Sequence, residues 1–219
     1  MAVTENTEYS YYSIKDRCRA GLLKYLDQAF NIVPDYSDPK ILDIGCGTGV
    51  PALWLAGHLS GSITCIDTDA RALGFLQHKI STSVKVISIE SRNLSFDDLP
   101  EGVESYDILL AEGFLNVVGF RAGFVKCAGL LKPGGCFVIH DEYRDHNDKV
   151  AFIAENRCTL AGTIYLDETI WWNDYYLQLE AEIAKPENLQ LRPMFGSEIS
   201  EISQYRENPA LFRSIHYIV

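Results

Sequence analysis

Short apolar runs alternate with longer segments in which apolar residues recur every three to four positions, from about residue 40 onward. The apolar runs predict β-strands at 40–44, 62–67, 84–89, 106–111 and 136–140. The longer segments predict helices at 14–29, 51–60, 70–80 and 119–131. Strands that alternate with helices are typical of a parallel sheet covered on both faces.

The pattern changes after residue 145. Two helical segments, 148–161 and 168–185, follow one another without an obvious strand between them, which indicates an insertion or cover. The segment 189–194 predicts a sixth strand, 198–205 a helix and 214–219 a closing strand. We therefore expect one α/β domain with a mostly parallel, seven-stranded sheet.

Composition narrows the function classes. The chain has 219 residues, 47% of them hydrophobic and 22% charged, which is typical of a globular protein with a core. Its net charge of −11 disfavours nucleic acid and anionic membrane surfaces as partners. No apolar stretch is long enough to span a bilayer, and the polar, acidic start resembles no secretion signal, so we expect a cytoplasmic protein. The six cysteines form no C-x-x-C pair, and we expect core thiols and no metal.

The most informative stretch is 41–51, Ile-Leu-Asp-Ile-Gly-Cys-Gly-Thr-Gly-Val-Pro, which predicts a strand, a glycine-rich turn and a helix. Glycines at 45, 47 and 49 allow positive φ angles and a close approach of the backbone to a ligand, while the amides of the helix start offer donors. The dinucleotide pattern G-x-G-x-x-G would need glycine at position 50, where Val50 stands.

This turn, with Asp43 two residues before Gly45, resembles the first motif of the class I S-adenosylmethionine-dependent methyltransferases. The segments 106–113 and 131–138 look like the family too, and the resemblance covers about residues 40 to 143. It implies a Rossmann-like three-layer sandwich with a helical cover. It also implies four parts: an N-terminal helix and lid at 1–37, a cofactor-binding core at 38–145, a helical insertion or cover at 146–188, and C-terminal strands and a helix at 189–219.

The resemblance implies S-adenosylmethionine as the cofactor and Asp67, at the end of the second strand, as the residue that takes the ribose hydroxyls. The alternative is that Asp67 only caps the helix that starts near Asp69. After the third strand the chain departs from the family's Gly-Asp pair and reads Ile89-Glu-Ser-Arg-Asn-Leu94, where a solvated loop is the alternative to an adenine contact. The expected cofactor contacts are Asp43, Gly45, Cys46, Gly47, Gly49, Asp67, Thr68, Ser91, Arg92, Asn93, Glu112 and Gly113.

Ligands of this fold gather at the carboxyl ends of the strands, which is where the catalytic candidates lie. His140 is the candidate base, because its usual pKa suits neutral pH; the alternative is a histidine bonded to its neighbours. Glu112 is expected to orient the acceptor or to lie near the sulfonium. With Asp141 or Glu142 it could instead imitate a Mg²⁺ site, the less favoured interpretation. Aromatic residues of the lid and cover, Tyr11, Tyr12, Trp171, Trp172 and Tyr175, are expected to bind the acceptor, the alternative being core packing.

The sequence thus predicts a methyltransferase that acts on an unidentified small molecule by in-line displacement. The alternatives are a methyltransferase acting on protein or RNA, a catalytically silent S-adenosylmethionine-binding protein and a nicotinamide-dependent oxidoreductase. The last is disfavoured because the chain lacks the sixth-position glycine of the dinucleotide pattern. The sequence leaves the acceptor and the oligomeric state open.

Overall fold

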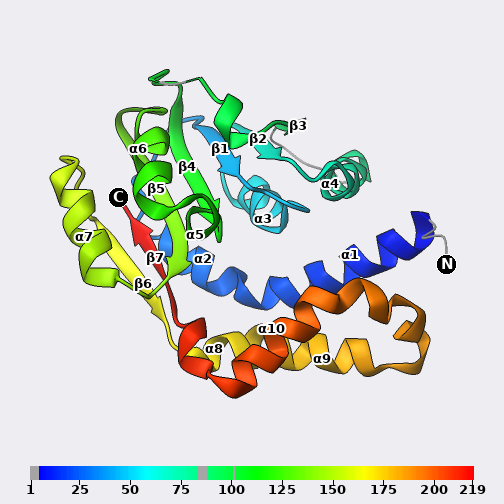
Figure 1. The fold of residues 1–219 in the computed structure, drawn as a ribbon. Helices are drawn as coiled ribbons and strands as arrows, with labels where there is room; N and C mark the ends of the chain where they lie inside the picture. The colour runs from blue at the N-terminus through cyan, green and yellow to red at the C-terminus, as the bar shows by residue number, and fades with distance from the viewer. Residues whose placement is uncertain (1–4, 83–87, 101) are drawn as a thin grey trace.

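The computed structural model describes residues 5–82, 88–100 and 102–219 (Figure 1). Its strands are β1 (Lys40–Ile44), β2 (Ser62–Asp67), β3 (Ser88–Asn93), β4 (Tyr106–Glu112), β5 (Leu131–Glu142), β6 (Gly162–Leu166) and β7 (Ser214–Ile218). Its α-helices are α1 (Glu5–Arg19), α2 (Leu23–Phe30), α3 (Val50–His58), α4 (Ala70–Thr82), α5 (Leu115–Val118), α6 (Phe120–Ala128), α7 (His146–Glu155), α8 (Glu168–Trp171), α9 (Leu177–Ala184) and α10 (Gly196–Glu207). Short 3-10 helices are η1 (Ala20–Leu22), η2 (Phe96–Asp98), η4 (Pro186–Phe195) and η5 (Pro209–Phe212), and η3 (Trp172–Tyr176) is a π-helix.

The strands form one seven-stranded sheet in the order β3-β2-β1-β4-β5-β7-β6. Neighbours from β3 to β5 are parallel, whereas β7 runs antiparallel to both β5 and β6. The predicted fold, a mostly parallel seven-stranded sheet with helices on both faces, is therefore confirmed.

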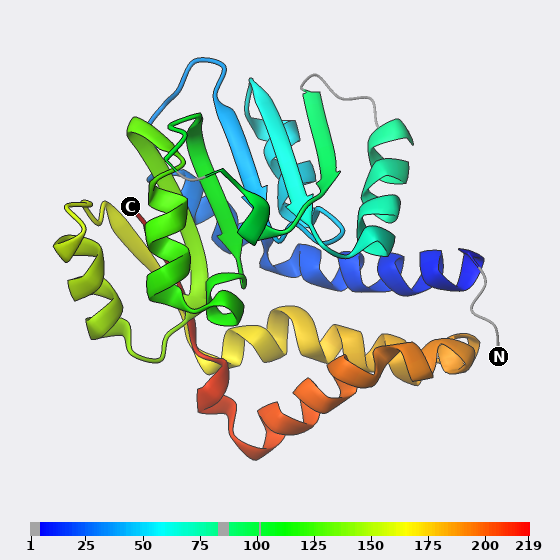
Figure 2. The same cartoon turned by 45° about the horizontal axis from the view of Figure 1, so that its top comes forward.

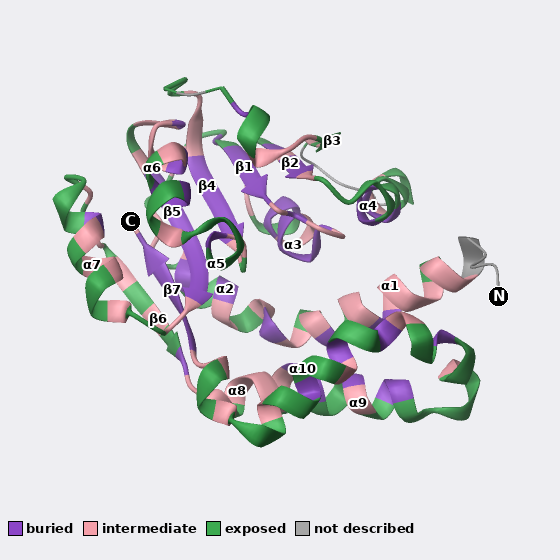
Figure 3. Ribbon diagram, in the orientation of Figure 1, coloured by how far each residue is buried: buried purple, intermediate pink, exposed green. Residues whose placement is uncertain are grey.

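Each face of the sheet carries its own apolar layer. Figure 3 shows that β4, β5 and β7 are buried over much of their length. On one face α2, α3 and α4 contribute Leu26, Leu55 and Leu76 to the core, and on the other α6 and α7 contribute Phe124 and Ile153. The strands lie between two apolar layers, which explains why they read as nearly continuous apolar runs rather than as alternating ones.

A third layer lies across the edge of the sheet where β1 to β4 end. Figures 1 and 2 show α1 running along this edge, with α9 and α10 beyond it. Buried residues of α1, α9 and the segments that follow, such as Ile14, Leu179 and Phe195, form a separate apolar cluster. The cover is thus held to α1 by its own small core and leaves room between itself and the strand ends. No helix of the described residues is long and apolar enough to cross a membrane.

Several predicted elements differ from the observed ones. The sixth strand is not 189–194, which lies in the 3-10 helix η4; it is β6 at Gly162–Leu166, inside the segment expected to be a purely helical cover. Leu191 and Phe195 pack into the cover's cluster, so the alternating Leu-Gln-Leu pattern reflects a half-buried 3-10 helix. β6 instead pairs with β7 from Gly162 to Leu166.

The third and fifth strands are shifted. Of the predicted strand 84–89, positions 84–87 lie outside the described residues, and β3 continues to Asn93, so Ser91, Arg92 and Asn93 stand in a strand and not in a solvated loop. The predicted turn before the fifth strand belongs to β5, which begins at Leu131 with an irregular register against β4. The other predicted strands match to within a residue.

Candidate active site

A cavity of about 770 Å³ lies between the carboxyl ends of the strands and the cover. The glycine turn and the end of β2 form one wall, and the ends of β4, β5 and β7 form a second. Helix α1 and the aromatic start of the cover form the rest. A volume of this size falls in the range typical of small-molecule and cofactor sites.

The glycine turn is built by backbone conformation. Gly45, Gly47 and Gly49 all have positive φ, at 70°, 52° and 75°. A Cβ at Gly49 would lie 2.5 Å from Leu76 Cδ1, whereas a Cβ at Gly47 would meet nothing within 4 Å. Gly49 is therefore required by core packing. Gly47 borders the cavity, and only the lack of a side chain keeps that space free.

Asp67 lies beside this turn. Its Oδ2 accepts a hydrogen bond from the Gly47 amide at 2.7 Å, and its Oδ1 accepts one from the Asp69 amide at 2.8 Å. The helix α4 is capped by Asp69, whose Oδ1 accepts from the amides of Arg71 and Ala72. Asp67 is thus not the helix cap. Each carboxylate oxygen has two lone pairs, so it retains acceptor capacity toward the cavity.

Asp43, under the turn, is 1% exposed, and its two carboxylate oxygens have no hydrogen-bond partner among the described residues. Burial, together with the nearby charges of Glu112 and Asp67, raises the pKa of Asp43 to about 8. An unpartnered carboxyl at the wall of a cavity suits a ligand that brings a positive charge or a donor. Together with the open space at Gly47 and the free acceptor capacity of Asp67, it fits the nucleoside and the cationic part of S-adenosylmethionine.

Helix α1 is tied to this wall through Asp16. Its Oδ1 accepts a hydrogen bond from the Thr48 hydroxyl at 2.5 Å, and its Oδ2 pairs with Lys79 of α4. The predicted lid position of the N-terminal helix is consistent with this contact, because Tyr12 and Asp16 both line the cavity.

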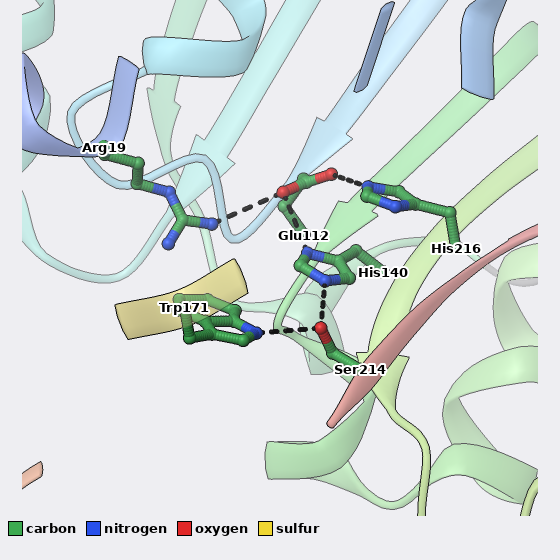
Figure 4. A network of polar contacts seen from close by, with 6 residues as sticks. All are labelled: Arg19, Glu112, His140, Trp171, Ser214 and His216. Atoms are coloured by element: carbon green, nitrogen blue, oxygen red, sulfur yellow. Dashed lines mark hydrogen bonds and ion pairs between the residues drawn. The ribbon is translucent and has the colours of Figure 1, made fainter. Parts of the chain in front are cut away.

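Three ionisable side chains stand in a row across the second wall (Figure 4). Glu112 of β4 is in register with His140 of β5, and His140 is in register with His216 of β7. Glu112 Oε2 lies 3.2 Å from His140 Nδ1, and Glu112 Oε1 lies 2.9 Å from His216 Nε2. Arg19, at the end of α1, also reaches Oε2, at 3.3 Å. The row therefore comes from strand register and not from closeness in sequence.

The row holds Glu112 as an anion. Burial raises the pKa of Glu112, but the charge and hydrogen bonds of His140 and His216 outweigh it and hold the pKa well below its usual range. Burial, reinforced by the charge of His140, lowers the pKa of His216. One buried carboxylate is thus shared by a guanidinium and two imidazoles.

His140 makes a further contact through its second nitrogen. Its Nε2 lies 2.9 Å from Ser214 Oγ, which also accepts a hydrogen bond from Trp171 Nε1 at 2.9 Å (Figure 4). The rings of Trp171, His140 and His216 stack with interplanar angles of 10°. Trp171 and Ser214 line the cavity, so this network ends at its surface.

The same three groups offer ligand atoms within 4.8 Å of one another, which makes them a candidate metal cluster. Their orientation argues against it. The imidazole planes are nearly parallel, with centroids 4.1 Å apart, so the in-plane lone pairs of the two rings do not converge on one ion. The oxygen-rich alternative is also unfavourable, because Asp141 pairs with Lys149 and Glu142 with Arg144. The arrangement favours a proton-sharing network.

The structure brings together most of the predicted site residues. The cavity is lined by Asp43, Gly45, Cys46, Gly47, Asp67, Glu112, Gly113, His140, Tyr12, Trp171 and Tyr175. Seven predicted residues do not line it: Gly49, Thr68, Ser91, Arg92, Asn93, Tyr11 and Trp172. Gly49 packs against Leu76, and Tyr11 and Trp172 pack within the cover. Arg92 pairs with the exposed Glu90, while Asn93 Nδ2 donates to the carbonyls of Asp67 and Thr68. Ser91 stands in β3 beside Cys65.

Three residues of the network were missed by sequence reasoning: Arg19, Ser214 and His216. Ser214 and His216 are two positions apart in a predicted apolar strand, which places both side chains on one face. Two polar residues on the same face of a buried strand were the available signal. Arg19 offers no comparable signal, since a basic residue in the last turn of a helix is common.

Comparison with known proteins finds methyltransferases. The family of the methyltransferase domain matches residues 41–135. The methyltransferase GfsG of Streptomyces halstedii is 28% identical over 170 residues, 72% of this chain and 59% of that protein. The ubiquinone/menaquinone biosynthesis C-methyltransferase UbiE of Geotalea daltonii is 35% identical over 103 residues, 46% of this chain and 44% of that protein. The chain thus matches about half the length of these curated relatives.

Among solved structures, the cyclopropane synthase MmaA2 from Mycobacterium tuberculosis superposes with a TM-score of 0.67 at 13% identity, covering 90% of this chain and 82% of that one. At this identity the likeness concerns the fold alone. It extends beyond the matched domain, since it spans most of the cover as well as the sheet.

Proposed function

Because the chain belongs to the class I S-adenosylmethionine-dependent methyltransferases, we propose that it transfers a methyl group from this cofactor to a small molecule held in the same cavity. One observation carries the proposal. The open space at Gly47, the acceptor capacity of Asp67 and the unpartnered Asp43 lie on one wall of a cavity. The other walls of this cavity hold the Glu112–His140 pair and aromatic side chains.

The residues divide between two tasks. Asp67 and the turn around Gly47 would hold the nucleoside, and Asp43 would face its positive charge. When bound, the cofactor supplies an electrophilic methyl group on a sulfonium, and alignment of donor and acceptor provides most of the rate enhancement. Trp171 and Tyr175 would pack against the acceptor, and the cover with α1 excludes water from the reacting atoms.

A small-molecule acceptor is supported by the size of the cavity. The cover and α1 border the space beside the glycine turn, and about 770 Å³ must hold both the donor and the acceptor. The net charge of −11 disfavours RNA as the acceptor. A protein or RNA methyltransferase and a silent binding protein are outcomes that the experiments below distinguish.

Calorimetry with S-adenosylhomocysteine tests the cofactor site. We expect Asp67→Ala to weaken binding at least about tenfold, because a charged acceptor pair for the ribose is lost. Asp167→Ala is the matched control, since Asp167 accepts a hydrogen bond from the Thr169 amide, a contact similar to that of Asp67 with Asp69, but lies outside the cavity. Unchanged affinity in Asp67→Ala would remove the ribose assignment.

Released S-adenosylhomocysteine, measured across a panel of metabolites, then tests the acceptor class. We expect turnover with at least one small molecule. Labelling of cell protein or RNA by tritiated cofactor, without turnover of any small molecule, would instead favour the macromolecular alternative. Binding without any transfer would favour the silent binding protein.

A further inference from the structure

The hydroxyl of Ser214 borders the same cavity as His140 and contacts its ring. Ser214 begins β7, is 6% exposed and lines the cavity, and its Oγ lies 2.9 Å from both Trp171 Nε1 and His140 Nε2. His140 itself is 3% exposed, and its other nitrogen contacts Glu112. Both ring nitrogens of His140 are thus occupied, and neither is free to meet an acceptor directly.

The direction of each hydrogen bond follows from the groups involved. An indole N–H can only donate, so Ser214 Oγ accepts from Trp171. The ionised carboxylate of Glu112 can only accept, so His140 carries its hydrogen on Nδ1. A neutral imidazole then has its lone pair on Nε2, and the Ser214 hydroxyl donates to it. The chain of donors runs from Trp171 through Ser214 to His140.

In this series of hydrogen bonds, His140 and not His216 is the proton acceptor. Its Nε2 donates to Glu112 Oε1, so its lone pair is on Nδ1, a buried atom without a hydrogen-bond partner among the described residues. His216 therefore stays neutral beside the carboxylate and does not compete for the proton. The imidazolium that would form at His140 faces the negative charge of Glu112.

We propose that Ser214 relays a proton from the acceptor to His140, and that the acceptor is a phenol. This inference rests on the proposed methyl transfer. The acceptor O–H gives its proton to Ser214 Oγ while Ser214 gives its own proton to His140 Nε2. The phenolic oxygen forms the bond to the methyl carbon, the carbon–sulfur bond breaks with its electron pair left on sulfur, and the proton remains on His140 until solvent takes it.

The choice of a phenol follows from the surroundings of Ser214. Trp171 has ring contacts with Tyr175 and Tyr176, and Tyr176 has one with Phe212. All four line the cavity, so aromatic side chains gather near Ser214 where a planar ring could pack. A relay is useful only for an acceptor that arrives with its proton, which a carboxylate does not. A hydroxyl with a pKa near 10, like that of tyrosine, is neutral at physiological pH and becomes reactive when it loses the proton.

Nuclear magnetic resonance of the protein labelled with [¹⁵N]histidine tests the proton chain without any acceptor. With S-adenosylhomocysteine present, we expect His140 to be protonated on Nδ1 and to accept a hydrogen bond on Nε2, and Ser214→Ala to abolish the latter signature. Protonation of His140 on Nε2 in the neutral form would overturn the relay, while calorimetry on the same samples reports the cofactor site separately.

Two probes test the relay in turnover. At pH 8 phenol is neutral, whereas 4-nitrophenol is largely ionised and needs no base. We expect Ser214→Ala to lower kcat for phenol about a hundredfold, a usual size for general-base effects, and at least ten times more than it lowers kcat for 4-nitrophenol. Equal losses with both probes would show a purely structural role for Ser214. Trp171→Phe, which keeps the ring and the proton path, is expected to cost only a few-fold.

The order Ser214, His140, Glu112 also resembles that of a nucleophilic serine. Covalent labelling of Ser214 by a fluorophosphonate would overturn the relay in favour of that chemistry. Failure of both phenols as acceptors, with cofactor binding and the His140 signature intact, would overturn the assignment of the acceptor class. Loss of cofactor binding in the wild type would instead refute the proposed function.

Discussion

The two walls of the cavity are built in different ways. The wall that fits the nucleoside comes from one short stretch, the turn at 45–49, and from the strand end at Asp67. The second wall combines Arg19, Glu112, His140, Ser214 and His216 from segments up to about 200 residues apart, and strand register aligns all of them except Arg19, which comes from α1. A local motif suffices for the first wall, whereas the second exists only in the folded sheet.

The largest expected effect comes from a substitution in the first wall alone. Gly47→Val should abolish measurable binding of S-adenosylhomocysteine, because the side chain enters the ligand's space and the positive φ disfavours a β-branched residue. Calorimetry measures the affinity and circular dichroism the fold. Gly134→Ala is the control, since Gly134 also has a positive φ and open surroundings but lies outside the cavity. Retained binding in Gly47→Val would refute the turn's role.

A change in the second wall should affect folding as well. Glu112→Gln is expected to lower the free energy of unfolding by about 2 kcal/mol. The amide oxygen can accept from one histidine N–H, but the amide NH₂ then faces the N–H of the other histidine, and two donors cannot bond to each other. Urea denaturation measures the effect. Glu90→Gln, at an exposed position, should leave the midpoint unchanged. An unchanged midpoint for Glu112→Gln would mean that the network contributes no stability.

Asp43 gives the first wall a pH dependence. Its folded-state pKa of about 8 exceeds the unfolded value, so the stabilisation is complete below about pH 4 and is lost as the pH rises toward 8. Between pH 5 and pH 8 we expect the free energy of unfolding of the cofactor-free protein to fall by about 1 to 2 kcal/mol because of this group. That is less than the full value of about 1.4 kcal/mol per pH unit. Urea denaturation should show a flatter profile for Asp43→Asn, and equal slopes would contradict the raised pKa.

The smallest expected effect concerns metal. We predict that EDTA leaves methyl transfer unchanged, because the stacked rings of His140 and His216 do not direct their lone pairs at one point. Activity assays with and without EDTA, with added Mg²⁺ or Zn²⁺ for comparison, measure this. A loss of activity that Zn²⁺ restores would show that the network rearranges into a metal site.

The sequence predicted the first wall far better than the second. Runs such as 40–44 and 62–67 are apolar throughout because both faces of those strands are buried, and a glycine turn is visible letter by letter. β6 was missed because it is short and only half-buried, and it lies between helical segments. The pairing of His140 with His216 depends on how β7 is placed against β5, which no local pattern of either strand specifies.

The π-helix η3 has a consequence for how acceptor choice can change. A π turn contains one residue more than an α turn, and here it separates Trp171 from α9. The π turn takes up the extra residue locally, so deleting one residue here would restore an α-helix with little rotation of α9. We expect such a deletion to move the aromatic residues of this segment relative to the cavity while leaving the strands and the turn at 45–49 untouched.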